Sequence, residues 1–418
     1  MKNAKKFRAS SLVTSGLVVA VLVGRIALAA AQSNVSAPGA PPSNQGVRFK
    51  TLVNFSVGDT VYRNFVELAN GNLIGAGGGG AYGSGMIFEM TPDGTRKTLY
   101  SFCEESGCPD GSGPTGLVLG ADGNFYGITF GGGAYGHGTV FKFAALTTLT
   151  TLHSFDNTDG APGAGGYLVQ AGGNLYGTTE NGGNLAQCYD NGCGSIFEIA
   201  PSGTPFTTLY NLCSQPACAD GAILFASLVL GTDGNFYGAT WGGGPGNGGT
   251  VFKMTPTGTL TTLHSFCVTY YPFCEGDNPI GLVLGTDRNF YGTTAAGGNN
   301  SPMGTVFKIT PTGTLTTIYN FCAKTGCTDG SSPREGLTLG SDGNFYGTTY
   351  YGGTYNDGTV FKLTPAGVLT TLHSFDGKDG NYPLGPLFEA ANGTLYGTTS
   401  AGGCNGGGTI FSLVVGLK

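Results

Sequence analysis

Ten of the eleven cysteines in this chain occur as close pairs, which is the pattern that most directly implies chemistry. The pairs are Cys103 with Cys108, Cys188 with Cys193, Cys213 with Cys218, Cys267 with Cys274, and Cys322 with Cys327. Such spacing predicts local disulfides in an oxidising compartment, each worth about 2 kcal/mol if unstrained. Structural zinc is the alternative, but pairs in successive repeats are expected to lie too far apart to share an ion. Cys404 is left over as a candidate free thiol.

Three of the four histidines fall at one position of an internal repeat, where alternate copies carry tyrosine. These are His153, His264 and His373. We expect half-buried packing residues with a satisfied ring nitrogen, not catalytic groups. The loop after each copy ends in an aspartate: Asp59, Asp110, Asp159, Asp220, Asp277, Asp329 and Asp379. Recurrence in every copy favours aspartates that cap a turn by accepting hydrogen bonds from backbone amides.

Residues that break the repeat are the candidates for a ligand site. Aromatic side chains occupy one loop position in alternate copies: Phe130, Trp241, and Tyr350 with its neighbour Tyr351. Such rings could offer flat apolar platforms to a sugar ring or to the surface of a partner protein. Capping of strand ends is the competing interpretation.

Polar groups that do not repeat are the other candidates: His137 and Glu180, followed by Arg63, Arg334 and Asp357. No pair among them has a spacing that implies a catalytic dyad, and catalysis needs titratable groups that converge. Only 11% of the residues are charged. We therefore assign no catalytic residue, no metal site and no cofactor, with calcium in the Asp-x-x-Asp-Gly loops as the alternative.

The elements that must position these residues repeat seven times. An Asn-x-Tyr-Gly hairpin, or a close variant, ends at Gly75, Gly127, Gly177, Gly238, Gly292, Gly347 and Gly397, which are 50 to 61 residues apart. Repetition at this period predicts a propeller or a solenoid. Each copy contains four short runs rich in β-branched and aromatic residues, which we name strands A to D. Asp-Gly turns join A to B, and Thr-Pro-x-Gly turns join C to D.

The two ends of the repeat region are offset by one strand. Residues 50–55 match strand D and precede the first A strand, whereas the last copy stops after strand C at residues 408–413. The sequence therefore predicts an all-β, seven-bladed β-propeller of four-stranded antiparallel blades, in which the N-terminal strand completes the last blade. Closure of the ring removes open sheet edges. The long, variable D-to-A and B-to-C loops share one face of such a ring, so we place any site there.

Residues 1–31 have the layout of a secretory signal peptide, with basic residues, an apolar stretch and small residues at its end. Residues 32–46 are expected to be a disordered linker, and 47–418 the propeller. Removal of 1–31 takes away five positive charges and no acids, so the net charge falls from −6 to −11. That acidity argues against nucleic acid as a partner. We expect a secreted monomer, extracellular or periplasmic, with no membrane attachment after cleavage.

The unit Gly-Leu-x-Leu-Gly-x-Asp-Gly-Asn-Phe-Tyr-Gly-Thr-Thr, followed by Gly-Thr-Val-Phe-Lys and Thr-Pro-x-Gly, resembles the GloVer tandem repeat of exported bacterial proteins. The resemblance covers Phe49 to Leu413. It implies a bacterial exported protein of unassigned activity, often with a C-terminal surface anchor; no such anchor is recognisable here, which favours release or periplasmic retention. The repeat is more distantly similar to streptogramin-lyase-type propellers, but their catalytic histidine and glutamate have no matching motif.

Three functions remain open on the sequence. We expect a secreted or cell-surface, non-catalytic propeller that binds a glycan or an exported protein through the D-to-A and B-to-C loops. A carbohydrate-active enzyme, such as a polysaccharide lyase or hydrolase that uses His137 or Glu180, is the first alternative. A purely structural surface module is the second.

Overall fold

The computed structural model describes residues 46–416, apart from 60, 187, 189–190, 269–273 and 299–302, and without the side chains of 61–64 and 164. The predicted signal peptide, 1–31, and the predicted linker up to residue 45 lie outside the described residues. Within that described part, no helix combines the length and apolar character needed to cross a bilayer.

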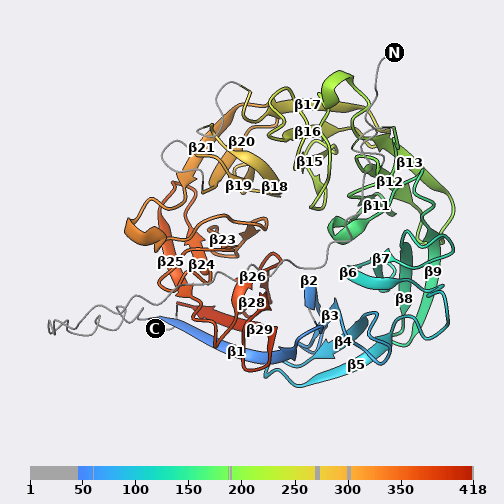
Figure 1. Ribbon diagram of the computed structural model, residues 1–418, viewed down its shortest axis with the longest axis horizontal. Coiled ribbons are helices and arrows are strands. Elements are labelled where there is room, and N and C mark those ends of the chain that lie inside the picture. The colour runs from blue at the N-terminus through green and yellow to red at the C-terminus, as the bar shows by residue number, and fades with distance from the viewer. Residues whose placement is uncertain are drawn as a thin grey trace, which may run out of the picture. The chain divides into compact units, whose positions relative to one another are not determined.

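Seven antiparallel sheets form the propeller, and Figure 1 shows them arranged in a ring. Blades one to three consist of β2 (Val61–Glu67), β3 (Leu73–Gly77), β4 (Met86–Met90) and β5 (Arg96–Ser101); β6 (Ser112–Leu119), β7 (Phe125–Gly131), β8 (Thr139–Ala144) and β9 (Thr148–Ser154); and β10 (Tyr167–Ala171), β11 (Asn174–Thr178), β12 (Ser195–Ile199) and β13 (Phe206–Asn211). Blades four to six consist of β14 (Val229–Leu230), β15 (Phe236–Thr240), β16 (Thr250–Met254) and β17 (Leu260–Ser265); β18 (Asp277–Leu284), β19 (Phe290–Ala296), β20 (Thr305–Ile309) and β21 (Leu315–Asn320); and β22 (Thr338–Leu339), β23 (Phe345–Thr349), β24 (Thr359–Leu363) and β25 (Leu369–Ser374).

The seventh blade closes the ring as the sequence predicts. It consists of β26 (Asn381–Pro383), β27 (Phe388–Glu389), β28 (Leu395–Ala401), β29 (Gly406–Val415) and β1 (Val47–Ser56). The first strand pairs antiparallel with the last one, with Val47 opposite Val415 and Phe49 opposite Leu413. Three short 3-10 turns, η1 (Gly163–Gly165), η2 (Pro216–Cys218) and η3 (Thr325–Cys327), are the helical segments of the described residues. The predicted fold class is confirmed.

A glycine in strand B and a phenylalanine in strand C form a recurring pair inside every blade. In blade four, a Cβ added at Gly238 would overlap the Phe252 ring, and the equivalent glycines of the other six blades face equivalent rings. The phenylalanines, among them Phe88, Phe141 and Phe307, are fully buried. The Tyr-Gly of the repeat is therefore a packing requirement, because only glycine leaves room for the ring of the next strand.

The Asp-Gly-Asn-Phe-Tyr part of the repeat builds a polar network at the tight A-to-B turns. Asp233 accepts hydrogen bonds from Asn235 Nδ2 at 2.8 Å, the Tyr237 hydroxyl at 3.0 Å and Lys253 Nζ at 2.7 Å. Blades two, five and six repeat this network around Asp122, Asp287 and Asp342. Burial raises the pKa of Asp233, but these hydrogen bonds outweigh it and hold the pKa well below its usual range.

Blade three makes the same network with its charge relocated. Its A-to-B turn carries Gly172 in place of the aspartate, and strand C carries Glu198 in place of the lysine. Glu198 Oε1 accepts hydrogen bonds from Asn174 Nδ2 at 2.6 Å and from the Tyr176 hydroxyl at 2.9 Å. Burial, and then the Glu198 carboxylate, raise the pKa of Tyr176 to about 12. Blade three thus also has one acidic side chain in its network, on strand C instead of in the A-to-B turn.

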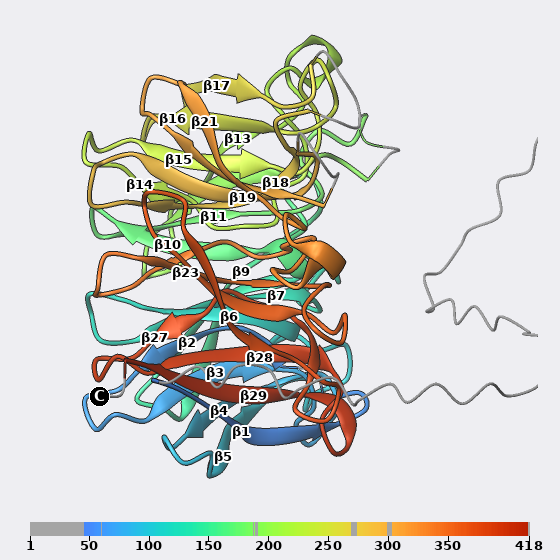
Figure 2. The same ribbon diagram turned by 90° about the vertical axis from the view of Figure 1, so that its left-hand side faces the viewer.

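Figure 2 shows that the tight hairpins lie at one end of the strands and the longer loops at the other. The longer loops are the D-to-A and B-to-C connections, as the sequence predicts.

We predict that Asp233→Asn makes stability less sensitive to acid. Because the pKa of Asp233 is depressed in the folded state, its contribution is present above about pH 4, the usual pKa of aspartate, and is lost as the pH falls below that value. The variant should be less stable than the parent at pH 7 and should lose less stability between pH 5 and pH 2. Urea unfolding across that range measures this, and an unchanged pH profile would contradict the prediction.

We predict that Phe49→Ala weakens ring closure. The Phe49 ring stacks on His373 of blade six, with centroids 3.7 Å apart and planes 5° apart, and contacts Phe411 of the last strand. Loss of a packed phenylalanine should cost about 3 kcal/mol. Urea denaturation measures the change, with Lys50→Ala at the neighbouring exposed position as the control. Equal stabilities of the two variants would show that the stacking contributes nothing.

Candidate functional site

A cavity of about 350 Å³ opens among residues of five consecutive blades. Its lining residues are Glu180, Ile223, Phe225, Trp241, Ile280, Arg334 and Leu384. The A strands lie on the inside of the ring, as β6, β18 and β26 show in Figure 1. Residues from blades three to seven can meet only near the ring axis, and each of these residues lies where a D-to-A loop enters strand A or strand B leaves the sheet. The cavity is therefore the mouth of the axial channel on the long-loop face, and we call it the axial pocket.

Four of the lining residues occupy one position of the repeat. This position comes directly after a residue that is proline in blades five, six and seven. The residues at the position are Phe225, Ile280, Arg334 and Leu384 in blades four to seven. The equivalent residue of blade two, Thr115, is buried and donates a hydrogen bond from Oγ1 to the Gly166 carbonyl at 2.6 Å. The pocket wall thus differs in residue type from blade to blade at one position of the repeat.

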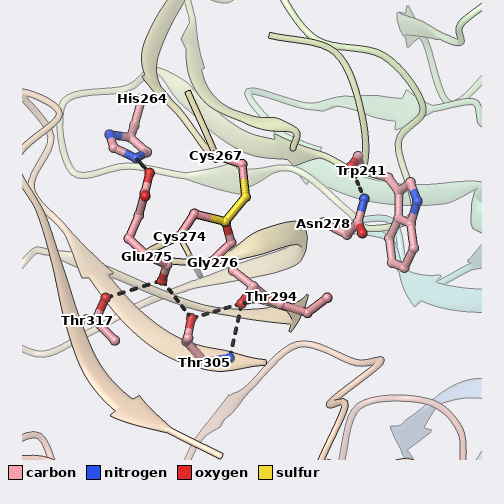
Figure 3. Close-up of a disulfide and its surroundings, with 11 residues drawn as sticks. Trp241, His264, Cys267, Cys274, Glu275, Gly276, Asn278, Thr294, Thr305 and Thr317 are labelled. Carbon is pink, nitrogen blue, oxygen red and sulfur yellow. Dashed lines mark hydrogen bonds and ion pairs between the residues drawn. A yellow bond between two sulfur atoms is a disulfide. The ribbon is translucent and has the colours of Figure 1, made fainter. Parts of the chain in front are cut away.

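Trp241 is held in the pocket wall by its own backbone. Its amide donates to the Ile223 carbonyl at 2.8 Å. Its carbonyl accepts from Asn278 Nδ2 at 2.8 Å, as Figure 3 shows. The indole meets the Phe225 ring edge to face, with centroids 5.2 Å apart. Two backbone anchors and one aromatic contact therefore fix this platform, which leaves the sole tryptophan of the chain partly exposed at the pocket.

Arg334 stands on a stack of planar groups. Its guanidinium lies 4.2 Å from the centroid of the Tyr350 ring. The Tyr350 ring stacks in turn on Tyr382, with centroids 4.8 Å apart and planes at 11°. Tyr351 meets Tyr350 edge to face at 4.8 Å and is 37% exposed. The Tyr350 ring therefore supports Arg334 at the pocket, and its role as a ligand platform stays a prediction.

Glu180 provides the carboxylate of the axial pocket. Its backbone amide donates to the Pro162 carbonyl at 3.1 Å. Its side chain crosses Gly163 so closely that a Cβ at that glycine would overlap the carboxylate. Gly163 has a φ of 56°, which also favours glycine.

The structure gathers some of the candidate residues and separates others. Trp241 and Glu180 line the axial pocket, and Tyr350 with Tyr351 adjoins it through Arg334. Phe130 lies outside the lining, where its ring covers Gly113 and is 41% exposed. His137 also lies outside the lining, and the Arg63 side chain is outside the described residues.

Sequence reasoning missed the apolar members of the lining, Ile223, Phe225, Ile280 and Leu384. An alignment of the positions that follow the strand A proline would have found three of them.

Comparisons with known proteins agree with this architecture. A sequence profile described as the Gloeobacter/Verrucomicrobia repeat matches residues 62–273 and 267–415. The chain belongs to this repeat family. None of the curated proteins matches the chain in sequence. The resemblance inferred from the repeat unit is confirmed.

Solved structures resemble this Gloeobacter/Verrucomicrobia repeat protein at low sequence identity. The extracellular domain assigned to a hybrid two-component system of B. thetaiotaomicron has 12% identity and a TM-score of 0.56, covering 87% of this chain and 39% of that one. A puromycin-hydrolyzing peptidase of Mycobacterium tuberculosis has 11% identity and a TM-score of 0.49, covering 84% and 52%. The aldose sugar dehydrogenase of Streptomyces coelicolor has 15% identity and a TM-score of 0.46, covering 90% and 100%. The chain spans well under half of the first of these proteins.

The repeated histidines of this repeat protein pair with carboxylates, as expected for structural residues. His153 and His373 Nε2 lie 2.7 Å from Asp159 and Asp379. Tyrosine replaces histidine in alternate blades: the Tyr210 hydroxyl donates to Asp220 at 2.8 Å, and burial followed by that carboxylate raises the pKa of Tyr210 to about 12.

The loop aspartates also accept backbone amides, which confirms the capping role for Asp110, Asp159, Asp220, Asp329 and Asp379. Asp277 departs from the prediction. It lies at the start of β18, where burial raises its pKa although the Asn278 amide lowers it. Glu275 takes its place beside His264, with Nε2 and Oε1 3.1 Å apart, as Figure 3 shows. The loop that contains Cys274 is longer, so the carboxylate comes earlier relative to the strand.

All five predicted disulfides are present, and Cys404 is exposed without a disulfide partner. Contrary to the prediction, the cysteine pairs of two different loops lie close together at one place. The Sγ atoms of Cys188, Cys193 and Cys213 all lie within 4.8 Å of one another, because the B-to-C loop of blade three packs against the connection to blade four. In this structure those sulfurs belong to disulfides.

The loop of the Cys188–Cys193 disulfide is hydrogen-bonded to the wall of the axial pocket. The Cys193 carbonyl accepts a hydrogen bond from the Ile223 amide at 2.8 Å, and the Ile223 carbonyl accepts one from the Trp241 amide. Two consecutive backbone hydrogen bonds thus connect the disulfide loop to Trp241 through Ile223.

We predict that Cys188→Ser combined with Cys193→Ser loosens Trp241. Loss of the cross-link should weaken the support of Ile223, so that the tryptophan emission shifts to longer wavelength as the indole gains access to water. The matched control is Cys103→Ser with Cys108→Ser, which removes a disulfide of the same spacing from the connection between blades one and two. Equal emission spectra for the two double variants would show that the Cys188–Cys193 disulfide does not support Trp241.

Proposed function

We propose that this chain is an exported, non-catalytic binding protein that holds one sugar unit of a glycan in the axial pocket. The observation that carries this proposal is the fixed Trp241 platform, which faces a cavity lined by apolar side chains and flanked by Glu180 and Arg334. Sugar rings bind through an apolar face against an aromatic ring, and their hydroxyls pair with polar groups at its edge.

The size of the axial pocket favours a small unit over a protein surface. A volume of about 350 Å³ lies at the lower end of the range of small-molecule sites. Stable protein interfaces bury roughly 800 Å² on each partner, which a single narrow mouth does not offer. An exported protein as the partner is therefore the less favoured form of the proposal.

The arrangement gives less support to an enzyme. A hydrolase or lyase needs titratable groups that converge on the reacting atoms. Glu180 is the one carboxylate among the described lining residues, and His137 is not among them. A purely structural module is the outcome to accept if the pocket binds nothing.

Five disulfides are consistent with an exported protein, because such bonds persist in oxidising compartments. We propose release from the cell or retention in the periplasm as the final location.

We predict that Trp241→Ala abolishes retention on a glycan matrix. Removal of a stacking ring should lower affinity about tenfold or more. Affinity electrophoresis of the purified protein against a panel of polysaccharides measures it. Phe130→Ala is the matched control, because it removes an aromatic ring from the same repeat position outside the pocket.

Retention that survives Trp241→Ala but fails in the Phe130 variant would move the site away from the axis. Product release from any polysaccharide would favour the enzyme.

A further inference from the structure

We propose that the sugar unit bound in the axial pocket carries a carboxylate, so that the ligand class is a uronic-acid-containing glycan. This inference rests on the proposed function and specifies its ligand. Arg334 carries it, as the one cation among the described residues that line the pocket.

The placement of Arg334 suits the recognition of an anion. The residue is exposed at the pocket, and its guanidinium carbon lies over the Tyr350 ring, which is itself stacked on Tyr382. A guanidinium held by one face on an aromatic ring keeps its N–H donors in the plane of its edge, where a carboxylate binds with two parallel hydrogen bonds. The Tyr350–Tyr382 stack restricts the side chain before the ligand arrives, which lowers the entropy lost on binding.

Arg334 is a cation in the pocket of a protein whose net charge is negative. The chain without residues 1–31 has a net charge of −11, so an exposed cation in a binding pocket runs against the general surface. Arg334 also occupies a repeat position that carries phenylalanine, isoleucine and leucine in blades four, five and seven. The fold therefore does not need a charged side chain at this position. We attribute the charge of Arg334 to ligand recognition.

The other pocket residues complete a consistent pose. Trp241 on blade four offers a flat face to the sugar ring, and it lies between Glu180 on blade three and Arg334 on blade six in the order of the blades. With the ring on the indole, the carboxylate of the sugar would point toward Arg334 and its hydroxyls toward Glu180. Glu180 would repel a second carboxylate, so we expect one acidic unit per site.

The test compares acidic probes with matched neutral ones. Tetragalacturonate and tetraglucuronate are titrated into the full-length protein by calorimetry, followed by their methyl esters, which keep the sugar but remove the charge. We expect the acids to bind about 10- to 100-fold more tightly than the esters, which is the range for hydrogen bonds to a charged partner.

Two variants of the same residue and one control separate the causes. Arg334→Gln should lower affinity for the acids to that of the esters, and Arg334→Lys should restore it only in part, because lysine cannot form the two-pronged contact. Arg288→Gln is the control, because it removes an exposed arginine from the A-to-B turn of blade five on the opposite face. Thermal unfolding checks that each variant is folded.

The outcomes distinguish this inference from the proposed function. If the acids bind no better than the esters, or if Arg334→Gln has no more effect than Arg288→Gln, the inference is overturned. If neutral glycans are retained through Trp241 in that case, the proposed function stands. If no uronate binds, the inference fails whatever neutral glycans do, and an absence of binding across the whole polysaccharide panel overturns the proposed function as well.

Discussion

The antiparallel pairing of β1 with β29 is the constraint on which the rest of the molecule depends. Each blade buries its faces only against its neighbours, so a ring with one open seam would expose two sheet faces and two strand edges. Backbone hydrogen bonds hold β1 against β29. The Phe49 ring also contacts His373 of blade six and Phe411 of β29. The axial pocket exists because of this fastening, since its lining comes from five blades that meet only when the circle is complete.

Inside the blades, almost every group that could do chemistry has a structural partner. The histidines and tyrosines of strand D hold the loop carboxylates, and the aspartates of the tight turns hold asparagine, tyrosine and lysine. Because these arrangements recur around the ring, they describe the scaffold. Function is left to positions where the repeat changes residue type, and Arg334 and Phe225 are such positions.

The fold could be predicted from the sequence because the signals are local and repeated. The turn residues, the Tyr-Gly of strand B and the offset of one strand each follow from neighbours along the chain. The site was only partly predictable. Trp241 and Glu180 stand out as irregular loop residues, but Ile223 and Phe225 look like ordinary strand residues until the ring brings them together. Phe130 follows the same pattern as Trp241 and yet covers Gly113. Asp277 was misassigned because, in a longer loop, the carboxylate that pairs with the strand D histidine belongs to Glu275.

The relocated acid of blade three limits how such a protein can diversify. Blade four keeps its negative charge in the turn and a lysine on strand C, whereas blade three has Gly172 in place of the turn aspartate and Glu198 on strand C. A recombinant blade that joined the A–B hairpin of one with strand C of the other would place two carboxylates against one tyrosine, or a lysine with no acid to meet. Both products would be destabilised. A transfer of strands A to C as one block would instead keep one acid in each network, so the three-strand segment behaves as one electrostatic unit.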